Sequence, residues 1–500
     1  MIERGSSMLA RTNRPSQRRL IRLPLNVAEW RLLLMGLDVL AVVAALLLAL
    51  AIRAIRINDE PSLTVFVDHP GWFVIMGGLW LAVGHALDAY EPSVAGRLEA
   101  GVPAVIRAGF LTCVLYLLIP WLTPALPESR VALISFPVLT IAMLVVGRRL
   151  FTWVLPRPSY ERQALIVGAG RAGTSVAEAL LQDAQVGYRV VGFVDDDPSK
   201  VGMSISIPEP RTASGGDRET RAALPVLGDR QQVQDLIARY RVSTLILAIT
   251  HDVDSDLLQK LMGCAEKGVE MIPMPVVYEQ LTGRVPVEHV GEKWYVGIPI
   301  HPRATGTFWG LTKRAMDIAL STAGLICLAP VLPVIALAIV LDSPGPVFYL
   351  QDRVGKGGTV FRALKFRSMV PGAEHDGAKF AQEHDPRVTR VGRVLRATHL
   401  DEFPQFVNVL RGEMSIVGPR PERPEFVERL AAVIPIYRLR HVVKPGMGGW
   451  GLVRQGYAGS HEDALIRLQY DLYYIKHQSL WLDLLIILKT IMHAVTLKGR

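Results

Sequence analysis

Four long apolar segments in the first 150 residues constrain the fold of this chain more than any other feature. They run over roughly 32–52, 72–86, 102–122 and 131–153, and the second is the weakest. Each can form about 15 to 23 residues of helix, which at ~1.5 Å per residue approaches or reaches a ~30 Å hydrocarbon layer. Half of the 500 residues are hydrophobic and the mean hydropathy is +0.28. We therefore expect a membrane protein with a bundle of four transmembrane helices over residues 31–155.

Basic residues flank this region at both ends. Before the first segment stand Arg11, Arg14, Arg18, Arg19 and Arg22, and after the fourth stand Arg148, Arg149, Arg157 and Arg162. The positive-inside rule places both ends in the cytoplasm, with residues 1–30 as a basic arm. Arg53 and Arg56, on the outer side in this arrangement, oppose it mildly. A buried helical bundle in a soluble protein is the alternative.

The net charge and the cysteines exclude several classes of protein. A charge of +9 suits anionic lipids or phosphorylated substrates, but the basic residues form membrane flanks rather than one stripe, so we expect no nucleic-acid partner. The three cysteines, Cys113, Cys264 and Cys327, are far apart, which excludes a disulfide framework and a zinc cluster. The soluble parts are therefore expected to face a reducing cytoplasm. No signal peptide is evident.

From Gln163 the pattern changes to short apolar runs separated by polar helical stretches. ALIVGAGRAG, YRVVGFVDDD, STLILAI and GVEMIPMP follow in turn. This alternation predicts a parallel sheet with crossover helices, a Rossmann-like α/β domain over residues 160–300. The stretch Ile207 to Ala223, rich in Pro, Gly, Arg and Thr, is expected to be a flexible surface insertion.

Gly168, Gly170 and Gly173 form a GxGxxG turn between the first expected strand and a helix, and Asp195 follows about twenty residues later. Such a turn lets a pyrophosphate rest on the helix amino terminus, while the carboxylate holds a ribose hydroxyl. An NAD-like nucleotide is thus one interpretation. The other is a tight turn that binds nothing, and no Tyr-x-x-x-Lys pair follows to perform hydride chemistry.

A last apolar stretch, Ile318 to Leu341, is long enough to cross a bilayer once. Pro330 and Pro333 lie near its middle, where each removes a helical hydrogen bond, so a bend is expected there. Basic residues stand at both ends: Lys313 and Arg314 before, Arg353 and Lys356 after. We expect a re-entrant hairpin over about 312–342 whose ends both stay in the cytoplasm. A kinked spanning helix is the alternative.

The adjacent carboxylates Asp401 and Glu402 are the candidate catalytic pair. Near a helix start both can reach a cation above the amino terminus, so one can attack phosphorus while its neighbour holds a divalent metal ion. Two solvated acids in an ordinary first turn are the plainer interpretation.

Basic residues in the same segment favour the catalytic interpretation, because forked guanidinium donors match phosphate oxygens. Arg420 lies in a rigid Gly-Pro-Arg-Pro turn. The candidate phosphate- or substrate-binding residues are Arg396, Arg420, Lys365, Arg367 and Arg353. Taken singly, each is more often a solvated surface group.

The stretch from Lys313 to the end resembles the bacterial sugar transferase family, the monotopic polyprenyl-phosphate phosphoglycosyl transferases. The matching pieces are KRAMD at 313–317, the proline-broken hairpin, QDRVG at 351–355, KFRSM at 365–369, LDE at 400–402, GEMSIVGPRP at 412–421, KPGMGGW at 444–450 and YDLYYIKHQSLWLDL at 470–484. The four preceding segments and the middle domain resemble the long members that begin exopolysaccharide or O-antigen (lipopolysaccharide) assembly. The resemblance implies a mainly helical catalytic domain over 308–500.

What the resemblance implies is transfer of sugar-1-phosphate from a UDP-sugar to undecaprenyl phosphate, with release of UMP. Asp401 would be the nucleophile, Glu402 would coordinate magnesium, and Arg396 and Arg420 would contact phosphates. Membrane lipids are implied partners, and a homodimer is left open. The family's hairpin often carries Ser-Pro at its bend, whereas this chain has Ala329-Pro330, so the bend should depend more on Pro333.

An aromatic run near the carboxyl terminus has two interpretations. Tyr473, Tyr474 and Trp481 can form an amphipathic anchor at the membrane surface, or the helix can be an ordinary core helix.

Two rival functions are kept open. A membrane-anchored nucleotide-sugar dehydratase or epimerase would need a second glycine-rich turn after residue 310, which is missing, and a non-catalytic regulator of polysaccharide export would not need Asp401.

Overall fold

The computed structural model describes the chain in thirteen stretches that together form two compact units, residues 1–160 and 161–500. The described stretches are residues 27–56, 65–90, 92–95, 98–117, 123, 130–154, 162–182, 188–208, 221–249, 255–289, 307–373, 385–455 and 461–495. The basic arm expected over residues 1–30 lies largely outside them.

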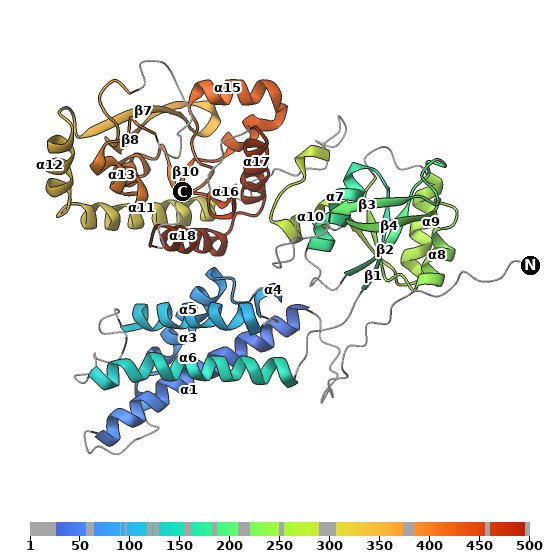
Figure 1. The fold of residues 1–500 in the computed structure, drawn as a ribbon, viewed down its shortest axis with the longest axis horizontal. Coiled ribbons are helices and arrows are strands. Elements are labelled where there is room, and N and C mark those ends of the chain that lie inside the picture. Colours follow the sequence, from blue (N-terminus) through green and yellow to red (C-terminus); the bar gives the residue numbers. More distant parts are fainter. Residues whose placement is uncertain are drawn as a thin grey trace, which may run out of the picture. The chain divides into compact units, whose positions relative to one another are not determined.

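The first unit is a helical bundle. Its helices are α1 (Val27–Arg56), α2 (Val65–Asp68), α3 (Pro70–Ala86), α4 (Pro92–Ala95), α5 (Leu98–Leu117) and α6 (Arg130–Val154), and Figure 1 shows the four long ones side by side. The four apolar segments therefore form four helices, as expected. Within the described residues, two regions are long and apolar enough to cross a membrane, Glu29–Ile52 and Ile134–Phe151, whereas Pro70–Ala86 and Gly101–Leu117 are shorter apolar helices.

One buried ion pair joins the first and last long helices of this bundle. The Arg148 guanidinium donates to both carboxylate oxygens of Asp38, the shortest contact being 2.7 Å, and also to the carbonyl of Ala89. Asp38 is 1% exposed and Arg148 is 4% exposed. Arg148, expected as a flanking charge, therefore lies inside the bundle, because α1 supplies a carboxylate for it.

The second unit begins with a six-stranded sheet in the order β3-β4-β2-β1-β5-β6. The strands are β1 (Arg162–Val167), β2 (Tyr188–Val194), β3 (Ser204–Pro208), β4 (Arg221–Gly228), β5 (Thr244–Leu247) and β6 (Glu270–Pro273). All neighbours are parallel except β3 and β4. The expected Rossmann-like topology is thus confirmed, with one antiparallel edge strand.

Helices cover both faces of this sheet (Figure 1). The helices α7 (Arg171–Gln182) and α10 (Met274–Thr282) pack on one face, and α8 (Val233–Tyr240) and α9 (Ser255–Glu266) pack on the other. The expectation of a flexible insertion from Ile207 to Ala223 is wrong at both ends. Ile207 lies in β3 and is 1% exposed, and Ala223 pairs with Ser206, while residues 209–220 lie outside the described part.

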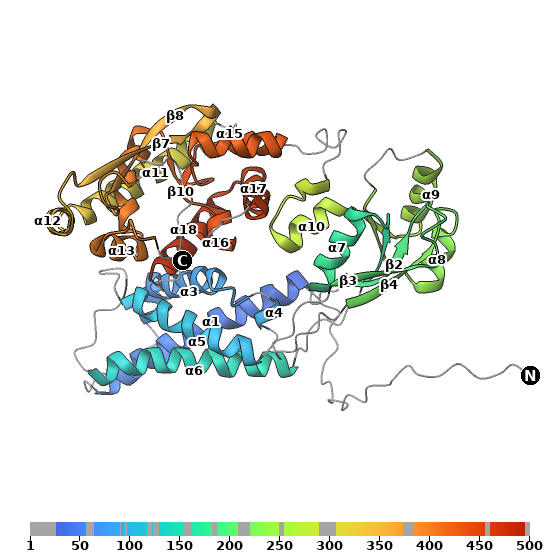
Figure 2. The ribbon, with the colours of Figure 1, turned by 45° about the horizontal axis from the view of Figure 1, so that its top comes forward.

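The transferase-like part follows from residue 307. It contains α11 (Thr307–Leu328), α12 (Leu332–Asp342), β7 (Phe348–Val354), η4 (Lys356–Gly358), β8 (Val360–Phe366), α13 (Arg390–Ala397), η5 (Leu400–Gln405), α14 (Phe406–Arg411), β9 (Ser415–Val417), α15 (Pro424–Val433), η6 (Pro435–Val442), β10 (Gly446–Gly448), α16 (Trp450–Gln455), α17 (His461–Lys476) and α18 (Leu480–Val495). Its mainly helical character agrees with the expectation, and its strands form the antiparallel pair β7–β8, labelled in Figure 2, and the parallel pair β9–β10.

The helices α11 and α12 are bent by 63° at the break between Leu328 and Leu332. The break contains Pro330, and Pro333 lies in the first turn of α12, where the missing N–H is tolerated. The bend is therefore where the two prolines predicted it. Apolar side chains on both arms remain exposed, including Ile326, Val334 and Leu337 at 67%, 66% and 61%.

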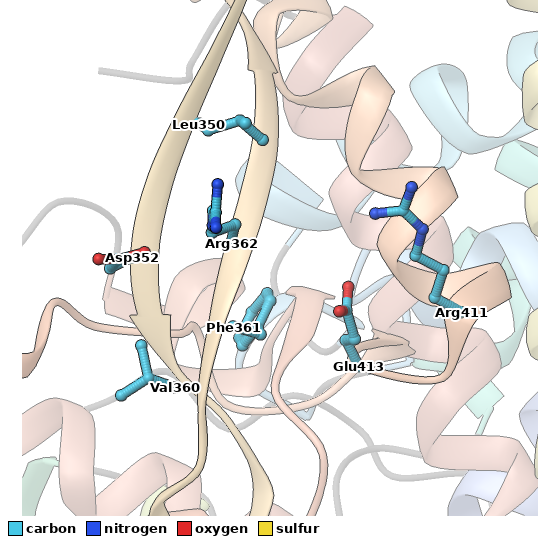
Figure 3. Close-up of a pocket in the computed structure, with 7 residues that line it drawn as sticks. All are labelled: Leu350, Asp352, Val360, Phe361, Arg362, Arg411 and Glu413. Atoms are coloured by element: carbon cyan, nitrogen blue, oxygen red, sulfur yellow. The ribbon is translucent and has the colours of Figure 1, made fainter.

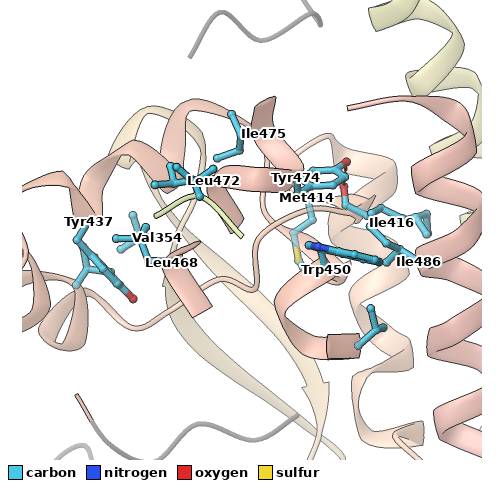
Figure 4. Close-up of a cluster of buried hydrophobic side chains, with 14 of the residues drawn as sticks. Val354, Met414, Ile416, Tyr437, Trp450, Leu468, Leu472, Tyr474, Ile475 and Ile486 are labelled. Atoms are coloured by element: carbon cyan, nitrogen blue, oxygen red, sulfur yellow. Dashed lines mark hydrogen bonds between the residues drawn. The ribbon is translucent and has the colours of Figure 1, made fainter. Parts of the chain in front are cut away.

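One hydrophobic core holds the transferase-like part together. It gathers Trp450, Leu468, Tyr474 and Ile486 from α16, α17 and α18 around Ile416 of β9 (Figure 4). Val285 and Val287, from the short η1 (Val287–His289) and the segment before it, belong to the same core. The end of the middle domain is thus built into the transferase-like part.

Candidate active site

Asp401 and Glu402 lie in the first turn of η5, one 3-10 helix that continues into α14. The residue before this helix, His399, has left-handed backbone angles, φ 56° and ψ 14°, and its carbonyl accepts the Glu402 N–H. Asp401 is 8% exposed and Glu402 is 9% exposed. The expected position at a helix start is confirmed, but the pair is buried rather than solvated, which removes the plainer interpretation of two surface acids.

Two cations from different elements hold Glu402. Lys365, on β8, places its Nζ 2.8 Å from Oε1, and Arg420, in the turn after β9, donates to both oxygens at 2.6 and 3.1 Å. Asp401 accepts no hydrogen bond from the described residues. The structure therefore brings together three of the predicted residues around Glu402 and leaves the neighbouring carboxylate available for another partner.

The pKa values of Asp401 and Glu402 are shifted in opposite directions. Burial alone would raise the pKa of Glu402, but the charges of Arg420 and Lys365 outweigh it and hold that pKa well below its usual range. For Asp401, burial and then the charge of Glu402 raise the pKa to about 6, against the pull of Lys365 and Arg396. Glu402 is thus a fixed anion, whereas Asp401 is a destabilised one.

Two further arginines donate hydrogen bonds to backbone carbonyls of the turn that carries Arg420. Arg353 donates to the Pro421 carbonyl at 2.8 Å, and Arg440 donates to the Arg420 carbonyl at 3.0 Å. Arg440 is itself paired with buried Asp471 at 2.7 Å. Arg353, predicted to bind phosphate, therefore supports the turn. Arg440 was missed by the sequence reasoning, because its role depends on a contact between α17 and η6.

The remaining predicted cations lie at different places. Arg396, in the last turn of α13, donates to the Ser368 hydroxyl at 3.0 Å and lowers the pKa of Asp401 by its charge, so it lies near the pair. Arg367 lies apart from it. Its buried guanidinium donates to the carbonyls of Ser343 and Pro344 at the end of α12. Arg367 thus holds the segment that follows α12, and its prediction as a phosphate ligand gains no support from these contacts.

A second buried network ties α11 to the strand that leads to Arg420. Lys313 donates to Asp483 at 2.6 Å and to the Val417 carbonyl at 3.1 Å, and the Tyr474 hydroxyl donates to Asp483 at 2.8 Å. Tyr474 is 1% exposed, which for this residue favours the core-helix interpretation over the membrane anchor. Of the three predicted aromatic anchors, Trp481 is exposed, at 52%.

A groove of about 500 Å³ lies along the outer face of β7–β8 (Figure 3). Leu350, Asp352, Arg362, Arg411 and Glu413 line it together with Val360 and Phe361. Neither Asp401 and Glu402 nor the cations near them, Lys365, Arg396 and Arg420, are among these lining residues. This groove is therefore separate from the Asp401–Glu402 pair.

In the glycine-rich turn of the middle domain the backbone packs closely against neighbouring backbone of the same domain. Gly168 has φ +109°, and a Cβ on Gly173 would lie 1.9 Å from the Gly168 carbonyl, so both glycines serve close packing. Asp195 accepts the Ala169 N–H at 2.6 Å and lies 3.3 Å from Lys200. The carboxylate predicted to hold a ribose thus closes the turn, as in the interpretation of a packing turn. Nucleotide binding stays a prediction.

A buried carboxylate pair held by two cations, in a part of the chain that also carries an exposed apolar bent helix pair, fits a membrane-associated transferase of phosphorylated groups. Comparison with known proteins agrees. The model of the bacterial sugar transferase family matches residues 308–497, and a model described as a CoA-binding domain matches residues 85–275.

The chain belongs to the bacterial sugar transferase family. It is 31% identical over 409 residues, 80% of its length and 71% of the other, to an undecaprenyl-phosphate glucose phosphotransferase of Komagataeibacter xylinus. It is 34% identical over 347 residues, 68% and 69% of the two lengths, to a UDP-glucose:undecaprenyl-phosphate glucose-1-phosphate transferase of Escherichia coli K12.

A further relative differs in the sugar that its name states. The chain is 44% identical over 236 residues to a UDP-N-acetylgalactosamine-undecaprenyl-phosphate N-acetylgalactosaminephosphotransferase of Aeromonas hydrophila. That match covers 47% of this chain and 55% of the relative.

Proposed function

We propose that this protein transfers sugar-1-phosphate from a UDP-sugar to undecaprenyl phosphate at the bacterial inner membrane. The observation that carries the proposal is the buried Asp401–Glu402 pair with its cations, in a chain whose long relatives are named for this transfer. The product would be undecaprenyl-diphosphate-sugar, the starting unit of an exopolysaccharide, capsule or O-antigen.

Asp401 is the proposed nucleophile, and the reaction has two half-reactions. An oxygen of its carboxylate attacks the β-phosphorus of the UDP-sugar, and the bond from that phosphorus to the bridging oxygen breaks, so UMP leaves with the electron pair. An oxygen of undecaprenyl phosphate then attacks the same phosphorus and releases the Asp401 carboxylate. The absence of a hydrogen bond to this carboxylate from the described residues supports the choice of Asp401 over Glu402.

The cations have distinct proposed tasks. Arg420 and Lys365 neutralise Glu402 and leave donor capacity beside the reacting carboxylate, which suits the equatorial oxygens of a transferring phosphoryl group. The Arg396 guanidinium has one bond, from Nε to Ser368, within the described residues. Its two terminal nitrogens are the proposed contacts for a second phosphate.

Magnesium is the proposed cofactor, with Glu402 as a ligand. The described residues contain no group of three or more His, Cys, Asp or Glu side chains that could hold a metal. Magnesium does not need one, because it commonly takes one or two carboxylates together with substrate phosphates. Burial and then the charge of Glu402 raise the pKa of Asp401 to about 6, so a cation bound here would favour its ionised form. When bound, it would neutralise diphosphate charge.

The membrane arrangement is also part of the proposal. The bent pair α11–α12 would enter one leaflet and return, and α1, α3, α5 and α6 would each cross the bilayer, so both soluble parts face the cytoplasm. A re-entrant pair keeps the catalytic part at headgroup depth, where a soluble donor and a lipid phosphate can reach one site. The exposed apolar side chains on both arms of the bend support this placement.

The test is nucleotide release from membranes containing the protein, supplied with magnesium and with UDP-glucose or UDP-N-acetylgalactosamine in parallel. We expect steady release of UMP only when undecaprenyl phosphate is added, and none from Asp401→Asn. Asp352→Asn, on the separate groove, is the matched control and should keep the wild-type rate. Wild-type turnover by Asp401→Asn would refute the proposal.

A further inference from the structure

His399 stands out next to the catalytic pair, and the sequence reasoning did not select it. It is the residue before η5 and adopts a left-handed backbone conformation, φ 56° and ψ 14°. His399 directly follows the C-cap of α13, a place where helices commonly end on a left-handed residue, and for a residue other than glycine this conformation costs on the order of 1 kcal/mol. Asparagine and glycine would tolerate the same angles better.

The imidazole of His399 also has an unsatisfied nitrogen. Nδ1 is buried and has no hydrogen-bond partner among the described residues. Most buried polar atoms in proteins are hydrogen-bonded, and a native exception calls for a ligand, a water or a strained functional role. The histidine as a whole is half-buried, so part of the residue is open to solvent while Nδ1 itself is covered by protein atoms.

The surroundings of the ring identify the kind of ligand. Glu402, Arg420 and Lys365 all act electrostatically on His399, which places the imidazole in the same charged cluster as the catalytic pair. The backbone links them as well, because the His399 carbonyl accepts the Glu402 N–H at 3.2 Å. A group that enters beside these two cations and Asp401 carries negative oxygens, and an imidazole N–H can donate to such an oxygen.

We propose that His399 is a further catalytic residue, whose Nδ1–H donates a hydrogen bond to an oxygen of the phosphoryl group that moves to and from Asp401. The inference rests on the proposed function. The substrate would supply the missing partner of Nδ1, and the left-handed backbone would keep the donor directed into the site. The contact adds a neutral donor to a set that otherwise consists of Arg and Lys side chains.

Two substitutions separate this role from a structural one. His399→Gly removes the imidazole and relieves the backbone strain, so it should unfold at a temperature no lower than that of the wild type. His399→Asn also tolerates the left-handed backbone, and its Nδ2 is attached to Cγ as Nδ1 is in histidine. It can therefore place a donor at the same position.

The experiment uses the full-length protein in membranes, with magnesium, undecaprenyl phosphate and whichever of UDP-glucose and UDP-N-acetylgalactosamine supports release of UMP. We expect kcat/KM of His399→Gly to fall about 10- to 100-fold, the loss typical of a hydrogen bond to a charged group. His399→Asn should stay within about 5-fold of the wild type, since it keeps most of that bond.

Wild-type kcat/KM in His399→Gly would overturn the inference, and so would a loss in His399→Asn as large as that in His399→Gly. Asp401→Asn is assayed beside them. If it is inactive while His399→Gly is fully active, only the role of His399 fails. If Asp401→Asn itself turns over, the proposed function fails.

Discussion

Replacing Asp401 by Asn should stabilise the protein at neutral pH while it abolishes activity. Burial and Glu402 raise the pKa of Asp401 to about 6, whereas an unfolded Asp has a pKa of ~3.9. The folded state therefore binds this proton more tightly, and ionising Asp401 costs stability at every pH above its folded pKa. Asparagine has the same shape and no charge, so it removes that cost.

The size of the gain follows from the shift. A difference of about two pKa units corresponds to roughly 3 kcal/mol at pH 7.5. The gain should shrink to about 1 kcal/mol at pH 4.5, because by then Asp401 is protonated in the folded protein and partly protonated in the unfolded chain. Because a protein of several domains does not unfold in one step, we expect the gain in stability to appear as a higher unfolding temperature of the second unit.

The assay is thermal unfolding of detergent-solubilised protein at pH 7.5 and pH 4.5. Asp385→Asn is a control of opposite sign, because hydrogen bonds from Arg387 lower the pKa of Asp385 to about 2. The Asp385→Asn substitution should lower the unfolding temperature at pH 7.5, and this loss should shrink as the pH falls toward 2. An Asp401→Asn protein that is no more stable than the wild type at pH 7.5 would show that Asp401 is not held as a destabilised anion.

Three further predictions follow from the same contacts. Lys313→Met leaves the 0% exposed Asp483 side chain without its cation and should lower the free energy of unfolding by about 3 to 5 kcal/mol. The double variant Lys313→Met/Asp483→Leu should recover most of this loss. Equal unfolding temperatures of the wild type and the single variant would contradict the network. The kcat/KM profile should fall below about pH 6 as Asp401 is protonated, and a flat profile from pH 5 to 8 would exclude it as the nucleophile. Chelation should stop UMP release until magnesium is restored, and unchanged turnover in EDTA would exclude the metal.

Where the sequence succeeded, the local pattern was sufficient. The parallel strands β1, β2, β5 and β6 coincide with the apolar runs, because a strand covered on both faces must be apolar throughout. The bend between α11 and α12 lies at Pro330, because proline acts on its own turn. The position of Asp401 and Glu402 at a helix start also agrees with the prediction, while their catalytic role stays a prediction.

Where the sequence reasoning failed, the outcome depended on contacts between distant residues. Phosphate binding by Arg367 stays a prediction, but its hydrogen bonds to the Ser343 and Pro344 carbonyls just after α12 could not be seen in the sequence. Tyr474 looked like an interfacial aromatic, yet α18 supplies Asp483 as its partner in the core. His399 carries no motif that marks it, and its left-handed backbone becomes visible only in three dimensions.

The central claim is that residue 401 carries the phosphorylated sugar between donor and acceptor. Its most direct test is mass spectrometry of the protein after a rapid quench with UDP-sugar and magnesium in the absence of undecaprenyl phosphate. We predict that the peptide containing Asp401 gains the mass of one sugar-phosphate, and that added undecaprenyl phosphate removes it. Turnover at the normal rate with no such mass on that peptide, in any quench, would contradict the account.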